Sequence, residues 1–167
     1  MSEYLDDMGK PPGKKPPNQV DHLYKERDEV LAVVLFVTRS SIRPYNPRNN
    51  HWLIAWELGM YGTNPIHRRI AVVQEAGVDH LTNWGPLTKS ASNATVTKTI
   101  GIPLKSMTLE ERQKLEEIAV NTPVLRPDGE WNCQDWLISV FEKAEERGII
   151  TNEEWSAAVE EAMKVTE

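Results

Sequence analysis

The sequence predicts an α+β fold, with a small antiparallel sheet followed by a helical C-terminal third. Short runs of β-branched and aromatic residues fall between residues 29 and 104. Helix-capping patterns and apolar residues at 3.6-residue spacing follow from residue 108 onward. Because strands and helices do not alternate along the chain, the order differs from that of a parallel βαβ sheet.

Residues 28–167 are predicted to form a single α+β domain, and residues 1–27 a flexible tail rich in proline and lysine. A chain of 167 residues suits one domain, and 40% hydrophobic with 26% charged residues is ordinary for a soluble globular protein. The first 20 residues hold four of the eleven prolines and few apolar side chains, so they bury too little surface to offset their ordering entropy. The alternative is that Pro11-Pro12 and Pro16-Pro17 form a stiff ligand for a protein partner.

Charge and composition argue against several classes of function. The formal net charge of -6 disfavours nucleic acid as a partner, because a phosphate backbone requires a clustered basic face. A single cysteine and the absence of metal-ligand spacing predict no disulfide, no metal and no cofactor. The N-terminus lacks the apolar segment of a signal peptide, and the longest apolar run, 30–37, is too short to span a bilayer. We therefore expect a cytoplasmic protein without a membrane partner.

Four segments have the composition of strands. Residues 29–38 (EVLAVVLFVT) read as a buried strand, and residues 51–58 (HWLIAWEL) alternate between two faces. Residues 66–75 follow turn residues and would pair with 51–58 as a hairpin. Residues 94–104 are rich in threonine, valine and isoleucine and are the fourth predicted strand. We expect the polar stretch between them, 76–93, to be a long hairpin or an irregular connection.

Three helices are expected in the last third of the chain. Each begins with a capping-box pattern: Thr108 with Glu111, Asn132 with Asp135, and Thr151 with Glu154. The second helix would end at Gly148, a residue suited to the left-handed position after a helix.

Cys133 is the leading candidate for a functional residue. It would lie in the first turn of the second helix, where unpaired backbone N–H groups and the helix dipole lower a thiol pKa. Its 3.6-residue spacing with 137, 140 and 144 directs it toward the sheet. Two histidines that start neighbouring strands, His51 and His67, are candidates for the base that a nucleophilic thiol needs.

These motifs resemble those of the circularly permuted papain-like thiol enzymes. That group includes the lecithin:retinol acyltransferase-like proteins, the permuted NlpC-type peptidases and the PPPDE isopeptidases. The similarity rests on His51-Trp52-Leu53-Ile54 at the head of an early strand, a second histidine near the next strand, and Asn132-Cys133-Gln134-Asp135-Trp136 at a helix start. Small fungal proteins of unassigned function carry a similar His-Trp strand and Cys-x-x-Trp helix, and the chain also resembles these.

The resemblance implies a cysteine-dependent hydrolase or acyltransferase with a permuted papain-like fold. Cys133 would be the nucleophile, His51 the general base and His67 the group that orients the imidazole. The spacing from His51 to His67 is longer than in the acyltransferase-like proteins, so Gln74 is the alternative third residue. Backbone N–H groups beside Cys133 would hold the oxyanion, and a small-molecule or peptide amide or ester would react through a thioester.

Two alternatives stay open on the sequence. Trp52, Trp131 and Trp136 would either wall an apolar substrate cleft or pack in the core. A lone cysteine on an apolar stripe is often inert packing. The second hypothesis is therefore a catalytically silent relative that acts as a protein- or small-molecule-binding module.

Overall fold

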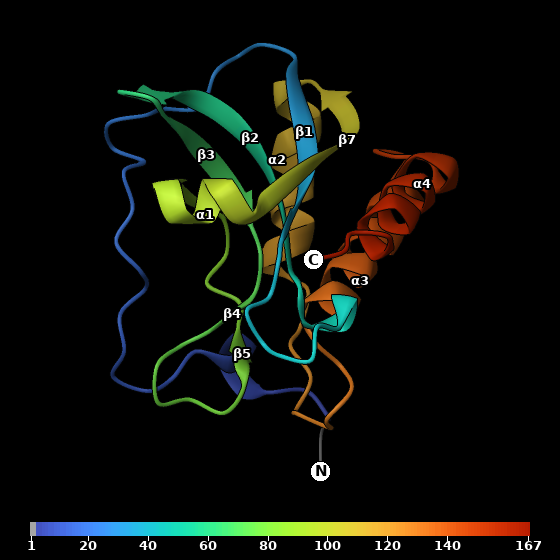
Figure 1. Cartoon of the computed structure of the whole chain (residues 1–167). Coiled ribbons are helices and arrows are strands. Elements are labelled where there is room, and N and C mark those ends of the chain that lie inside the picture. Colours follow the sequence, from blue (N-terminus) through green and yellow to red (C-terminus); the bar gives the residue numbers. More distant parts are fainter. Residues whose placement is uncertain (1–2) are drawn as a thin grey trace.

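The computed structural model describes residues 3–167 and has a five-stranded antiparallel sheet at its centre (Figure 1). The strand order is β6-β3-β2-β1-β7, and every neighbouring pair is antiparallel. The strands are β1 (Leu31–Thr38), β2 (His51–Tyr61), β3 (Asn64–Ile70), β6 (Leu87–Ser90) and β7 (Thr99–Met107). A separate two-stranded sheet pairs β4 (Val73–Gln74) with β5 (Leu81–Thr82).

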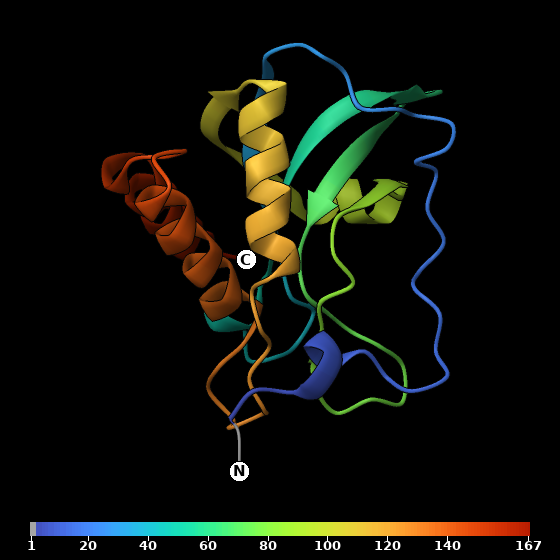
Figure 2. The ribbon, with the colours of Figure 1, turned by 180° about the vertical axis from the view of Figure 1, so that it is seen from behind.

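Helices cover the two faces of the main sheet unequally. α2 (Leu109–Val120), α3 (Cys133–Glu146) and α4 (Asn152–Met163) pack on one face, where α3 contacts β2 and α4 contacts β7 and β1 (Figure 2). The short α1 (Asn93–Lys98) lies on the opposite face (Figure 1). Two 3-10 turns, η1 (Asp6–Gly9) and η2 (Pro47–Asn49), complete the described elements. The predicted α+β class, with its larger helices toward the C-terminus, is confirmed.

The alternation of side chains divides the sheet into an inner and an outer face. The inner face packs on α2, α3 and α4 and consists of fully buried apolar residues: Val33, Leu35, Val37, Trp52, Ile54 and Trp56. The outer face carries the intervening positions of the same strands and is only partly covered by α1: Phe36, Thr38, His51, Leu53, His67 and Arg69. His51 therefore belongs to the face opposite the large helices.

All three capping boxes form as predicted, each with its two reciprocal hydrogen bonds. A Ser, Thr, Asn or Asp side chain at this position stabilises a helix by about 1 kcal/mol relative to alanine. Gly148 follows the end of α3 with a φ of 72°, as expected. The N–H groups of Gly148 and Ile149 close the helix by donating to the carbonyls of Glu145 and Ala144.

The strand predicted over 94–104 is wrong in its first half. Residues 93–98 form α1, and the strand begins at Thr99. Ser92 caps this helix by accepting from the Thr95 N–H at 3.1 Å, and Thr97 donates to the carbonyl of Ala94. These local side-chain-to-backbone bonds outweigh the strand preference of threonine and valine.

Residues 3–27 run along the side of the domain to β1 (Figure 1). The N–H of Leu5 donates to Val124 at 2.8 Å, and that of Val20 donates to Thr88 of β6 at 2.8 Å. These contacts give the segment defined neighbours, which its composition did not predict.

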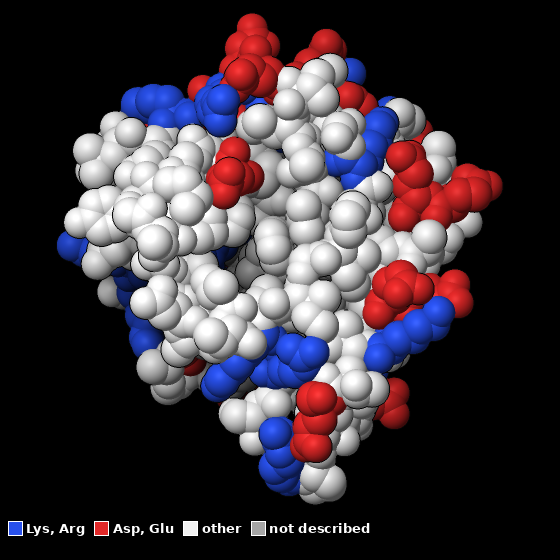
Figure 3. All heavy atoms as spheres, turned by 45° about the horizontal axis from the view of Figure 1, so that its top comes forward, with Lys and Arg blue, Asp and Glu red and all other residues white. Residues whose placement is uncertain are grey.

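The charged side chains of both signs are interspersed over the face in Figure 3, without a continuous basic surface there. Within residues 3–167, no helix has both the length and the apolar character needed to cross a membrane.

Candidate functional site

The N-terminus of α3 meets β2 where the pairing of β2 with β3 stops. That pairing runs from Tyr61–Asn64 to Ile54–Ile70 and does not continue to the start of β2. There the Cys133 thiol donates to the backbone carbonyl of Asn50 at 3.8 Å and accepts from the backbone N–H of Trp52. The first turn of α3 thus occupies the position that a strand partner would take.

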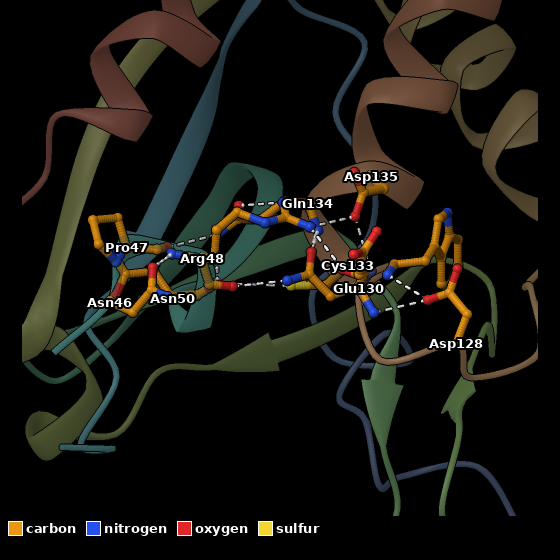
Figure 4. Close-up of polar contacts among 11 residues, drawn as sticks. Asn46, Pro47, Arg48, Asn50, Asp128, Glu130, Cys133, Gln134 and Asp135 are labelled. Carbon is orange, nitrogen blue, oxygen red and sulfur yellow. Dashed lines mark hydrogen bonds and ion pairs between the residues drawn. The ribbon is translucent and has the colours of Figure 1, made fainter. Parts of the chain in front are cut away.

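Arg48, in the turn η2, ties the same helix start to the loop before β2 (Figure 4). Its guanidinium donates to Gln134 Oε1 at 2.9 Å, to the Glu130 carbonyl at 2.9 Å and to Asp135 Oδ2 at 2.7 Å. Asn132 Nδ2 returns a bond to the Arg48 carbonyl at 2.7 Å. Asp135 also caps the helix, so one carboxylate serves both the helix start and the loop.

Two buried amide side chains complete this joint. Gln134 is fully buried, and its Nε2 donates to the carbonyls of Pro47 at 2.9 Å and Asn50 at 3.1 Å. Asn50 Oδ1 accepts from the Ser40 N–H at 3.0 Å, and its Nδ2 donates to the Tyr45 hydroxyl at 2.8 Å. The backbone next to His51 is therefore held by hydrogen bonds on both sides.

The environment of Cys133 favours the protonated thiol. Burial raises the pKa of Cys133, against the opposing effects of the Trp52 backbone N–H and the Arg48 guanidinium. The expectation that the helix start lowers this pKa is wrong, because desolvation of the thiolate outweighs the helix N-terminus. A protonated thiol is also what the hydrogen bond to the Asn50 carbonyl requires.

A cavity of about 340 Å³ brings together three of the predicted site residues, Cys133, His51 and Gln74. Within residues 3–167, no hydrogen bond joins the Cys133 thiol to His51. His51 pairs with Thr38 of β1 and points from the outer face, whereas α3 packs on the inner face. Gln74 reaches the cavity from β4, and its Nε2 donates to the Val78 carbonyl at 2.9 Å.

His67 does not reach this cavity. It lies opposite Glu57 on β2, six residues along that strand from His51, which corresponds to about 20 Å. Its ring packs against Phe36 at a centroid distance of 5.0 Å, and it lines a different cavity with Arg69. The expected orienting contact between His67 and His51 is therefore absent from this arrangement.

The three tryptophans that flank the motifs do not line the Cys133 cavity. Trp52 and Trp136 are each 1% exposed and belong to the core. Trp136 Nε1 donates to the Thr122 carbonyl at 3.1 Å. Trp131 is partly buried and packs against the core. The core alternative thus holds for Trp52 and Trp136, and the expected cleft wall is not formed by these side chains.

Sequence reasoning missed four residues that shape the two faces: Arg48, Asn50, Gln134 and Arg69. Gln134 bonds to the Arg48 guanidinium and to the Asn50 carbonyl across more than 80 residues of sequence, which no local pattern reveals. The sequence did contain an indication that Arg69 lies on a different face from Arg68. Because Arg68 and Arg69 are adjacent in a strand, their side chains must point to opposite faces, so both cannot be equally solvated.

No family model, curated protein or solved structure matches the chain. Within the described part of the chain, no group of three or more His, Cys, Asp and Glu side chains is arranged to hold a metal ion.

Proposed function

We propose that the protein is a cytosolic binding module of permuted papain-like architecture that holds a small molecule or peptide in the cavity beside Cys133. The observation that carries this proposal is the combination of an open cavity of about 340 Å³ with a thiol that already donates to the Asn50 carbonyl, directly before β2. A cavity of this volume falls within the size range of small-molecule sites in proteins.

The chemistry of the lining favours an uncharged polar ligand. The Arg48 guanidinium lies at the cavity but is engaged by Asp135 and two further acceptors. Gln74 uses its Nε2 for the Val78 carbonyl and leaves its Oε1 as an acceptor. Val72 and Leu81 add apolar walls. An amide group with a small apolar side chain satisfies these features.

The binding proposal is tested by titrating ¹⁵N-labelled protein with acetylated dipeptide amides that carry small apolar side chains. Binding should shift backbone amide signals of the segments that line the cavity, 48–51, 72–74 and 132–133. Val73→Phe, which fills the cavity, should abolish these shifts, whereas Val30→Phe at a 64% exposed position should leave them unchanged. Shifts that persist in Val73→Phe, or that fall elsewhere, contradict the proposal.

The second candidate is a cysteine-dependent hydrolase or acyltransferase. It is favoured by the placement of Cys133, His51 and Gln74 around one cavity. The His51 ring would have to turn around the end of β2 to accept the thiol proton. The sulfur would then attack the carbonyl carbon, and the oxyanion would accept hydrogen bonds from backbone N–H groups of α3. The leaving amine or alcohol takes the proton from His51, and water or an amine releases the acyl group from the thioester.

Mass spectrometry with an activated acyl ester distinguishes this second candidate. An acyl-enzyme would appear in the wild type as a mass increase that is absent from Cys133→Ser. It would form more slowly in His51→Ala. Equal labelling of wild type and His51→Ala, or no labelling at all, removes the enzyme hypothesis and leaves the binding proposal standing.

A further inference from the structure

Arg69 is a partly buried arginine that lacks an acidic partner. It lies on the outer face of β3, opposite Ala55 of β2. Its neighbour Arg68 is bonded to Glu116 Oε1 at 2.6 Å and to Thr88 Oγ1 at 3.2 Å. Among residues 3–167, by contrast, the Arg69 guanidinium makes neither a hydrogen bond nor an ion pair. A partly buried cation without a partner loses some of its hydration, and no group within the described chain replaces it.

The groups around Arg69 respond to its positive charge. His51, His67 and Lys89 each have a pKa lowered by burial and, in second place, by the charge of Arg69. Glu75 acts in the opposite direction on Lys89 and accepts from Trp84 Nε1 at 2.8 Å. The exposed Glu57 lies opposite His67 in register. Because their pKa values lie below 6.5, His51 and His67 are uncharged at pH 7, so a carboxylate that enters here pairs with Arg69 rather than with an imidazole.

Two adjoining cavities meet at Arg69 and Leu53. The larger has a volume of about 130 Å³ and apolar walls from Phe36, Pro65 and Val96, the last from α1. The smaller has a volume of about 70 Å³ and extends from Arg69 toward Lys89 and His51. A charged head beside Arg69 and an apolar body in the larger cavity would occupy the space that these side chains leave.

We propose that this outer-face pocket binds a carboxylic acid with a short apolar chain, its carboxylate on Arg69 and its chain against Phe36, Leu53 and Val96. The bidentate geometry of a guanidinium matches a carboxylate. The apolar walls favour a hydrocarbon body over a bare inorganic anion. This proposal does not depend on the function proposed for the cavity beside Cys133, although His51 and Val73 line both that cavity and the smaller one here.

The test is calorimetric titration of the full chain with hexanoate, hexanamide and inorganic phosphate. Hexanoate should bind, and hexanamide should bind at least tenfold more weakly because it lacks the charge that pairs with Arg69. Arg69→Gln should weaken hexanoate at least tenfold. Arg147→Gln, which removes the same charge from the end of α3, should leave the affinity unchanged.

A second measurement keeps the proposal testable if Arg69→Gln does not fold. The pKa of His67, which is lowered to about 4, should rise when hexanoate neutralises Arg69, and this is followed by the ring resonances of the wild type. The proposal is overturned if hexanoate and hexanamide bind equally, or if wild type and Arg69→Gln bind hexanoate equally. It is also overturned if phosphate binds more tightly than hexanoate, or if the His67 pKa is unchanged in saturating hexanoate.

Discussion

Replacing Arg48 with methionine tests the joint that fixes the start of α3 against the loop before β2. The substitution keeps most of the side-chain volume but removes the donors to Gln134, Glu130 and Asp135. Because the Arg48 and Asp135 side chains are each 36% exposed, their ion pair contributes at most about 1 kcal/mol. The larger loss comes from Gln134 Oε1, a buried acceptor left without a donor, at about 1–3 kcal/mol.

The expected loss is therefore about 3 kcal/mol of unfolding free energy. For a domain of this size it lowers Tm by about 9 °C, at roughly 3 °C per kcal/mol. Urea unfolding followed by tryptophan fluorescence measures it, with the slope m expected to stay unchanged. Arg147→Met, whose pair with Glu117 is exposed and 3.7 Å long, should change stability by less than about 0.5 kcal/mol.

Thiol reactivity gives an independent readout of the same substitution. If Arg48 holds the α3 N-terminus against β2, Arg48→Met should speed alkylation of Cys133 in the native state, because the helix start opens more often. If Arg48→Met lowers the unfolding free energy by less than about 1 kcal/mol, or by no more than Arg147→Met does, the Arg48 bonds do not hold the helix start.

Two further predictions concern charge. The pKa of His67 is lowered from 6.5 to about 4 in the folded protein, so protons bind the unfolded chain first and stability falls as pH drops from about 6.5 to about 4. After a discount for the partial exposure of His67, this residue accounts for about 1–2 kcal/mol of the lost unfolding free energy. Urea unfolding at pH 7.5 and 4.5 should show that His67→Gln reduces the loss by this amount. An equal loss in wild type and His67→Gln contradicts the prediction. Arg112 is fully buried and donates to Glu26 and to three backbone carbonyls, so Arg112→Met should cost about 3–5 kcal/mol and speed amide exchange across 27–31. Unchanged exchange there would show that Arg112 does not hold this segment.

Local patterns in the sequence were sufficient for the three helices of the last third of the chain. The cap at Asn132, its partner Asp135 and the glycine at 148 lie close together in the chain, and each acts through bonds to its own neighbours. Composition was less reliable over 94–98, where the hydroxyls of Ser92 and Thr97 satisfy backbone groups that a strand would have left to a partner.

The site was predicted only in part because its determinants act over long distances in the sequence. Reasoning on the helix N-terminus placed Cys133 correctly at the first turn of α3 and beside the sheet. It could not weigh desolvation, which depends on how closely β2 approaches the thiol and which reverses the direction of the pKa shift. The position of His67 depended on the register of β2 and β3, with its irregularity between Glu57 and Gly59, which strand composition does not specify.

Side chains along β2 alternate between the two faces of the sheet, and this alternation separates His51 from Cys133. Trp52 and Ile54 had to share one face, and His51 the other. Since α3 covers the face of Trp52, the imidazole and the thiol approach the same cavity from different sides of the strand. This separation is the physical reason for preferring a binding module over a thiol enzyme.

The protonation state of Cys133 distinguishes the binding module from the thiol enzyme most directly, and iodoacetamide alkylation measures it as a function of pH. In the native protein the apparent pKa should lie above that of the same thiol in urea, with slow reaction below pH 8 and no effect of His51→Ala. Rapid alkylation of the native wild type below pH 7, slowed by His51→Ala, would contradict the account and restore Cys133 and His51 as a catalytic pair.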